Sequence, residues 1–134
     1  MKKVIEVVAG IIEYEGNILC MQRNKSKCDE VSYKWEFPGG KIEVGESQEN
    51  ALTRELSEEM CMEVNVIGHF CDVEYEYVDY IVNMHCYKCT TNNSNFVMNV
   101  HKDYRWLPLN QLDILDWAPA DLSVVKMLMK EKRP

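Results

Sequence analysis

Three glutamates dominate the chemistry that this sequence could carry. Glu55, Glu58 and Glu59 stand at i, i+3 and i+4, a spacing that puts their side chains on one side of an α-helix. Like charges at these spacings destabilise a helix unless something offsets them. A solvated acidic face is the ordinary explanation. The alternative is a divalent cation, and a site made only of oxygen ligands favours Mg²⁺ or Mn²⁺ over Zn²⁺.

The position of Glu59 on this helix favours a cation site over a solvated acidic face. Leu52 and Leu56 define its apolar stripe, and at about 100° per residue Glu59 falls at the edge of that stripe. A solvated face would not place a carboxylate beside core leucines. Arg54 precedes Glu58 by four residues and can offset part of the negative charge.

The glutamates belong to a longer pattern that resembles the Nudix box, G-x5-E-x7-R-E-U-x-E-E-x-G-U, in which U is apolar. The match runs from Gly40 to Met62 and includes every charged position at its spacing. One position departs from the box, because Cys61 stands where the family has glycine. That glycine usually ends the helix, so we expect this helix end to be capped differently.

Segments outside the box extend the resemblance over nearly the whole chain. Residues 35–43 are similar to the segment before the box in the MutT branch of the family, and residues 117–121 are similar to its base-recognition turn. The CTP pyrophosphohydrolase members of that branch are especially similar at residues 5–9, 46–48 and 119–121.

The resemblance implies an α/β/α sandwich with a mixed central sheet, formed by one Nudix hydrolase domain over residues 1–134. It implies hydrolysis of a nucleoside triphosphate to the monophosphate and pyrophosphate, with Mg²⁺, or Mn²⁺ in its place, as cofactor. The implied substrates are CTP- or dCTP-type nucleotides, or 8-oxo-dGTP-type nucleotides. Two other functions stay open: hydrolysis of another nucleoside diphosphate derivative, and nucleotide binding without catalysis.

The resemblance also implies roles for single residues. The metal ligands would be the carbonyl of Gly39 and the carboxylates of Glu55, Glu58 and Glu59. Arg54 would orient these carboxylates and Glu46 would support Arg54, so that both belong to the catalytic set. The implied substrate-binding residues are Arg23, toward the phosphates or the nucleotide, and Trp35, Phe37 and Asp121, toward the base.

A second departure from the family leaves the general base open. The family usually has a glutamate before a loop histidine, as a metal ligand or general base, whereas Val100 precedes His101 here. Asp103 or His101 would then supply the base from the same loop, or Glu58 would serve alone.

The identity of the recognised base depends on Asp121. An ionised carboxylate only accepts hydrogen bonds, which suits the two adjacent donors of guanine and 8-oxoguanine. Cytosine presents a donor beside an acceptor, so it would need a protonated Asp121 or a second partner. Hydrogen-bond geometry thus favours guanine-type bases and the family resemblance favours cytosine-type bases. Asp121 could instead only stabilise the first turn of the last helix.

Composition limits the partners. The chain has 134 residues and a net charge of −7, which argues against a binder of polymeric nucleic acid or of a membrane surface. The sequence contains neither a signal peptide nor a span of about 20 apolar residues. We therefore expect a cytoplasmic protein, a monomer or homodimer, with six reduced cysteines. Cys86 and Cys89 should face opposite sides of a strand, because positions three apart do so.

The elements that hold these residues follow from periodicity and turn residues. One helix should follow the N-cap Ser47 and cover residues 51–60, and Pro38-Gly39-Gly40 should break the strand before it. Strands are predicted over 4–14, 18–23, 33–37, 64–77, 80–89 and 104–107, and a last helix over 120–130. Because only one helix lies between the strands, the order indicates an α+β fold with a mixed sheet.

Overall fold

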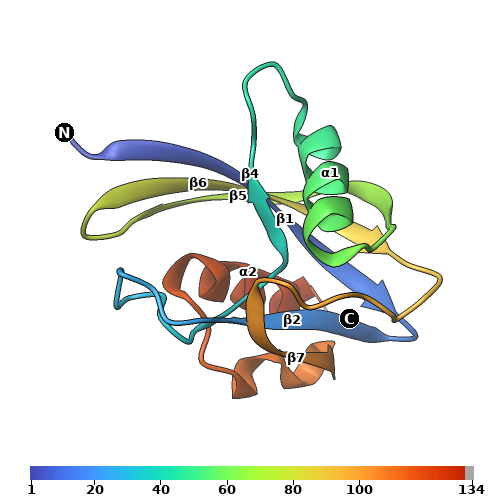
Figure 1. Cartoon of the computed structure of the whole chain (residues 1–134). Coiled ribbons are helices and arrows are strands. Elements are labelled where there is room, and N and C mark those ends of the chain that lie inside the picture. The colour runs from blue at the N-terminus through green and yellow to red at the C-terminus, as the bar shows by residue number, and fades with distance from the viewer. Residues whose placement is uncertain (132–134) are drawn as a thin grey trace.

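The computed structural model describes residues 1–131 and has a mixed sheet between two helices (Figure 1). The helices are α1 (Gln48–Met60) and α2 (Pro119–Glu131), with a 3-10 helix, η1 (Leu109–Ile114), before α2. The strands are β1 (Lys3–Tyr14), β2 (Asn17–Arg23), β3 (Trp35–Glu36), β4 (Gly39–Lys41), β5 (Asn65–Glu76), β6 (Tyr80–Thr90) and β7 (His101–Pro108). The α+β prediction with a mixed central sheet is confirmed.

The long strand β1 organises the sheet. The order is β3-β2-β1-β6-β5, while β4 also pairs with β1 and β7 also pairs with β2. The β1–β6 pairing is parallel and the other pairings are antiparallel. Along one edge, β1 pairs with β4 over Val7–Ala9 and with β2 only at Glu13 and Tyr14. Between these two partners, this edge of β1 has no paired strand residue among residues 1–131.

Alternate residues of β1 supply two apolar layers, as expected of a strand. Val8 and Ile12 pack in the layer that contains Leu52 of α1, and Ala9 packs in the layer that contains Val124 of α2. Each helix thus covers one face of the sheet with its apolar side. Burial of these side chains is the main force that holds α1 and α2 in place.

The region around Pro38 differs from the prediction. The strand expected over residues 33–37 is paired only in β3, and the chain resumes pairing in β4, which the sequence pattern did not predict. Gly39 lies so close to β1 that a Cβ atom would overlap the Val8 carbonyl. Gly39 thus permits a close strand pairing here instead of only breaking the chain.

Two further elements refine the prediction. The last strand begins at His101, not at Tyr104, because β7 pairs along the whole of β2. Pro119 is the first residue of α2, as expected for proline in a first turn. Cys86 and Cys89 lie in opposite apolar layers, which confirms that their thiols do not converge. Within residues 1–131, no helix has the length and apolar character needed to cross a bilayer.

Candidate active site

The ends of α1 fix the positions of its glutamates. The Ser47 hydroxyl accepts a hydrogen bond from the Asn50 amide at 3.1 Å, which confirms the predicted N-cap. At the other end Cys61 adopts a left-handed conformation with φ 51°, and the Met62 amide donates to the Leu56 carbonyl at 3.1 Å. The expectation of a different cap is wrong, because Cys61 takes the backbone conformation that glycine usually takes at this position.

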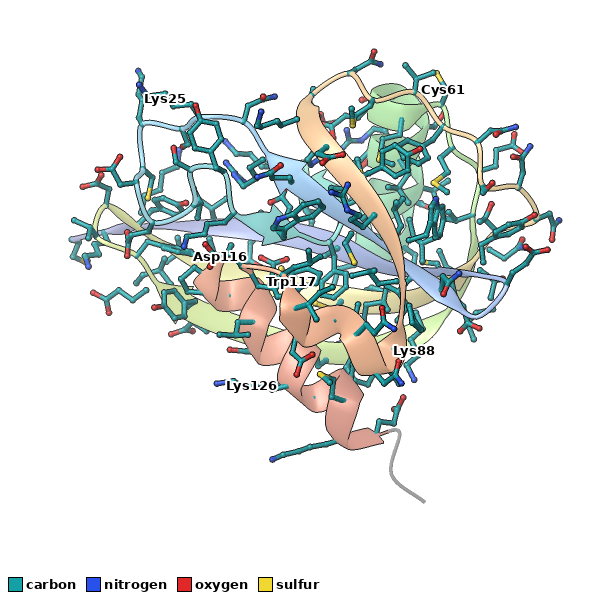
Figure 2. The ribbon with its side chains drawn as sticks, turned by 90° about the horizontal axis from the view of Figure 1, so that it is seen from below. Lys25, Cys61, Lys88, Asp116, Trp117 and Lys126 are labelled. Atoms are coloured by element: carbon teal, nitrogen blue, oxygen red, sulfur yellow. The ribbon has the colours of Figure 1, made fainter. Side chains whose placement is uncertain are left out.

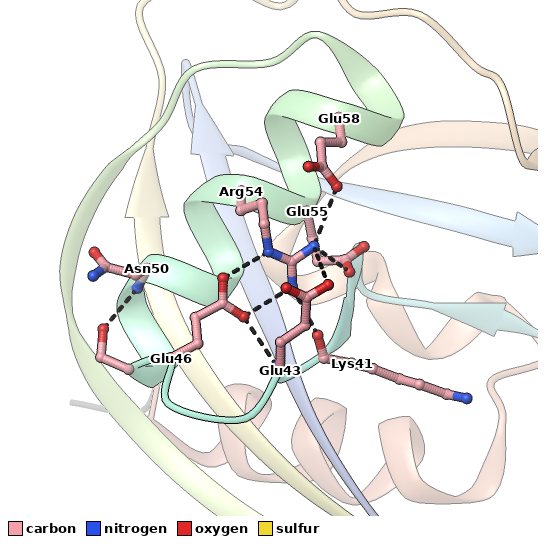
Figure 3. A network of polar contacts seen from close by, with 8 residues as sticks. Lys41, Glu43, Glu46, Asn50, Arg54, Glu55 and Glu58 are labelled. Carbon is pink, nitrogen blue, oxygen red and sulfur yellow. Dashed lines mark hydrogen bonds and ion pairs between the residues drawn. The ribbon is translucent and has the colours of Figure 1, made fainter.

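Arg54 is the centre of a polar network on α1 (Figure 3). Its Nε and Nη2 donate to the two oxygens of Glu46 at 2.6 and 2.9 Å. Its Nη1 donates to Glu55 at 3.0 Å and to Glu58 at 3.2 Å, and Nη2 also reaches the Lys41 carbonyl. The hydrogen bonds from Arg54 lower the pKa of Glu46 to about 2. Arg54 therefore connects the loop before α1 to two of the three box carboxylates.

Glu55 and Glu59 occupy less exposed positions than Glu58. The carboxylate of Glu55 lies against Gly40, where a Cβ atom would overlap it. Glu59 is partly buried, and burial followed by the nearby charge of Glu55 raises the pKa of Glu59. Two acidic groups are thus held close together at the end of β4, where the charge of Glu55 makes Glu59 harder to ionise.

This arrangement fits a hard divalent cation. The donors are carboxylate oxygens and backbone carbonyls, which Mg²⁺ and Mn²⁺ prefer. Positive charge beside Glu55 and Glu59 would offset the repulsion that raises the pKa of Glu59. Within residues 1–131 no three such side chains already surround a common point, since Arg54 holds Glu55 and Glu58.

A pocket of about 500 Å³ opens beside this cluster. Glu59, Gly39 and Gly40 line one part of it, and Phe37 and Asp121 line another. The volume is in the range of small-molecule sites. Cationic side chains also line the pocket, namely Arg23, Lys25 and Lys41. The pocket therefore combines Glu59 of the acidic cluster, three positive charges and a buried polar end.

Three charged or polar side chains from β2, β3 and β7 meet in the pocket. Glu36 accepts from Arg23 Nη1 at 3.0 Å, and its other oxygen is 2.8 Å from His101 Nε2. The His101 side chain is only 6% exposed, and its Nδ1 is buried without a hydrogen-bond partner among the described residues. Glu36 is a site residue that the sequence interpretation missed.

Asp121 lies at the buried end of the pocket, at the start of α2. Its Oδ2 accepts a hydrogen bond from the Phe37 amide at 3.0 Å. Burial, reinforced by the charge of Glu36, raises the pKa of Asp121 well above its usual range. Phe37 stacks on Trp117 with ring centroids 4.7 Å apart, and Figure 2 shows Trp117 beside α2. Burial therefore favours the neutral form of this carboxyl group, which is the form that the sequence interpretation required for cytosine.

Not every predicted site residue lines the pocket. Trp35 is buried in the α2 layer and lies outside the residues that line it. Asp103 also lies outside, with its carboxylate bound to the Tyr104 amide and Arg105. Val100 and His101 both line the pocket, so the position at which the resemblance predicts a carboxylate holds an apolar residue beside the pocket.

Comparison with known proteins agrees with this geometry. A family model described as NUDIX domain matches residues 4–128. The chain is 34% identical over 134 residues to the CTP pyrophosphohydrolase of Escherichia coli (strain K12), with 98% of each chain covered. It is 31% identical over 130 residues to the 8-oxo-dGTP diphosphatase of the same strain, with 97% of this chain and 99% of the relative covered.

Solved structures show the same likeness. The solution structure of the DNA mismatch repair protein MutT, a Nudix hydrolase from methicillin-resistant Staphylococcus aureus 252, is 44% identical, with a TM-score of 0.76 over 98% of this chain and 99% of that one. The crystal structure of MutT protein from Methanosarcina mazei Go1 is 23% identical and shares the fold, with a TM-score of 0.86 over 99% and 98% of the two chains. With the box on α1 and a family match over almost all its residues, the chain belongs to the NUDIX domain family.

Proposed function

We propose that this protein hydrolyses nucleoside triphosphates to the monophosphate and pyrophosphate with the help of Mg²⁺. The observation that carries the proposal is one pocket with Glu59 of the acidic α1 cluster on one side and buried Asp121 on another. A nucleotide has this same polarity, with phosphates at one end and a base at the other. Its relatives named CTP pyrophosphohydrolase and 8-oxo-dGTP diphosphatase support the assignment.

The metal ligands we propose are Glu55, Glu58, Glu59 and the carbonyl of Gly39. A bound Mg²⁺ would neutralise phosphate oxygens and lower the pKa of the attacking water. Arg54 holds the carboxylates of Glu55 and Glu58 in position, and Glu46 fixes Arg54 through two hydrogen bonds. Positive side chains of the pocket, Arg23 among them, would contact the triphosphate.

For the general base we propose His101. A carboxylate only accepts hydrogen bonds, so the contact with Glu36 places a proton on His101 Nε2 and leaves the lone pair of the neutral ring on Nδ1. A buried nitrogen without a partner costs roughly 1–3 kcal/mol, and a water donating to it would remove that cost. Of the other candidates, Asp103 lies outside the pocket and Glu58 is mostly exposed and bound to Arg54.

The preferred base we propose is cytosine. A neutral carboxyl group offers one donor and one acceptor side by side, which matches the N3 acceptor and the 4-amino donor of cytosine. The burial of Asp121 supports this neutral form. The second candidate is 8-oxo-dGTP, which is favoured by the relatives named for it. The enzyme would then act on free nucleotides in the cytoplasm.

The test is a panel of CTP, dCTP, dGTP, 8-oxo-dGTP, a dinucleotide and a sugar nucleotide, each with and without Mg²⁺. We expect pyrophosphate release that depends on Mg²⁺ and is fastest for CTP or dCTP. Turnover of the dinucleotide or the sugar nucleotide alone would show that the substrate is another nucleoside diphosphate derivative and not a nucleoside triphosphate. Nucleotide binding without any turnover would make the protein a binding module.

A further inference from the structure

Two cysteines outside the pocket face each other across neighbouring strands. Cys71 of β5 and Cys86 of β6 are register partners in the antiparallel pairing of these strands. Cys86 is fully buried in the apolar layer under α2, and Cys71 packs against the same layer from a partly exposed position. The two side chains therefore leave the sheet on the same face and at the same level.

The backbone geometry at this pair suits a disulfide. Directly opposed residues of antiparallel strands have Cα atoms about 4.5–5.5 Å apart, and a disulfide needs about 4.4–6.8 Å. The register of β5 and β6 therefore places the two cysteines at a spacing that a disulfide can span. Cys89 faces the opposite layer, and Cys61 lies at the exposed end of α1 (Figure 2), so neither competes for Cys71 or Cys86.

The two thiols differ in reactivity. The contact with Cys86 lowers the pKa of the Cys71 thiol, and His69 acts in the same direction. The contact with Cys71, together with burial, raises the pKa of Cys86. Because a thiolate is the attacking species, we expect Cys71 to react first and Cys86 to act as the resolving thiol. Cys71 is also partly exposed, whereas Cys86 is buried, so Cys71 is the more accessible of the two residues to a small oxidant.

We propose that Cys71 and Cys86 are a modification site at which hydrogen peroxide forms an internal disulfide. The Cys71 sulfur attacks a peroxide oxygen, the O–O bond breaks, and one water leaves while Cys71 becomes a sulfenic acid. The Cys86 sulfur then attacks the Cys71 sulfur, the S–OH bond breaks, and the thiol proton leaves with the hydroxide as a second water. Two thiols are oxidised and one peroxide is reduced to two waters.

The test uses the native full chain with Cys61→Ser, which removes the exposed thiol that could link two molecules. The protein is treated with hydrogen peroxide, blocked with N-ethylmaleimide and digested without reduction, and the peptides are identified by mass spectrometry. We expect a linked peptide that joins Cys71 to Cys86. The buried thiols of Cys20 and Cys89 should stay reduced and should be alkylated once the protein is unfolded. Thiol titration should show the loss of two thiols per chain.

Two variants separate the steps. In Cys71→Ser we expect no linked peptide and an unoxidised Cys86, because burial protects that thiol. In Cys86→Ala we expect Cys71 to stop at the sulfenic acid, which dimedone traps. Thermal unfolding of each variant checks that it is folded. A Cys71 that stays reduced while the exposed Cys61 of the unmodified chain is oxidised would overturn the proposal, as would a linked peptide that forms only in the unfolded protein.

Discussion

Burial and the nearby charge of Glu55 both disfavour the ionised form of Glu59 and raise its pKa. Glu59→Gln removes this charge while keeping the size of the side chain. We expect kcat to fall by at least about a hundredfold, as for the loss of a major electrostatic contribution. The melting temperature without metal should stay or rise, because repulsion from Glu55 is relieved. Activity within about threefold of the wild type would contradict the role as a metal ligand.

His101 and Asp103 offer a matched pair of substitutions on β7. In His101→Gln the amide can still donate to Glu36, but nothing replaces the lone pair of Nδ1. We expect kcat to fall by about 10²–10⁴-fold with little change in KM, the range for losing a general base. Asp103→Asn should leave both constants nearly unchanged. Steady-state kinetics of the two variants test this assignment. A large loss of kcat in Asp103→Asn with little loss in His101→Gln would identify Asp103 as the general base.

The protonation state of Asp121 can be tested with asparagine, which has nearly the same shape but no charge. Asn presents a donor beside an acceptor, as a protonated carboxyl group does, so Asp121→Asn should keep most of kcat/KM for CTP. Asp121→Ala removes both groups, and the loss should be about tenfold or more, from about 1.5–3 kcal/mol for such a hydrogen bond. Kinetics with CTP and 8-oxo-dGTP measure this. If both variants lose CTP turnover equally, the carboxyl group acts in its ionised form.

The residues of the box could be predicted from sequence because they lie within one helix and its preceding loop, where spacing fixes geometry. Glu36 could not be predicted in this way. It meets Arg23 and His101 only because β2 pairs with both β3 and β7, which brings together residues 13 and 65 positions away in the chain. The protonation state of Asp121 was also out of reach, because it depends on burial against Phe37 that no local pattern records.

At the scale of the elements, the C-terminal end of α1 carries a local strain. Cys61 has φ 51°, a conformation that costs about 1–2 kcal/mol for residues with a Cβ atom. Cys61→Gly should therefore raise the free energy of unfolding by about 1 kcal/mol, less than the full strain because glycine also gains freedom in the unfolded chain. Urea denaturation measures the change. An equal gain from Cys61→Ala would show that the thiol, and not the backbone, is the cause.

Two strands show the limits of prediction at this scale. The strand β6 was predicted nearly to its ends, because its apolar residues mark it clearly. The strand β4 was missed because Pro38, Gly39 and Gly40 are typical of a turn. Its pairing depends on the close approach of Gly39 to β1, a tertiary contact. Here the long-range pairing overrides a local turn signal.

At the scale of the whole molecule, one polar chain connects three strands on the α1 side of the sheet. His85 of β6 lies between Glu6 of β1, at 2.8 Å from Nε2, and Asp72 of β5, at 2.7 Å from Nδ1. Asn83 also donates to Glu6, and His69 contacts Asp72. Because carboxylates only accept hydrogen bonds, both nitrogens of His85 must carry a proton. These contacts favour the imidazolium form of the ring, which links the parallel β1–β6 pair to the edge strand β5.

The pH dependence of stability should report this link. The hydrogen bonds to Glu6 and Asp72 raise the pKa of His85 despite its partial burial. Its contribution is therefore fully present below the unfolded value of about 6.5 and is lost as the pH rises through the higher folded value. The pKa values of Glu6 and Asp72 are lowered, so their contributions are lost only as the pH falls through the acidic range.

We expect the wild type to melt at a higher temperature than the His85→Gln variant. The difference should be largest between about pH 5 and 6.5 and should shrink at higher pH. Gln can bond one carboxylate but carries no charge at any pH, so the variant lacks this part of the pH dependence. Thermal unfolding of both proteins from pH 5 to 9 gives the comparison, with His69→Gln as the control that keeps His85 and its two partners. A constant difference between wild type and His85→Gln across that range would show that His85 contributes only by packing, and that β5 is held to the sheet without the imidazolium.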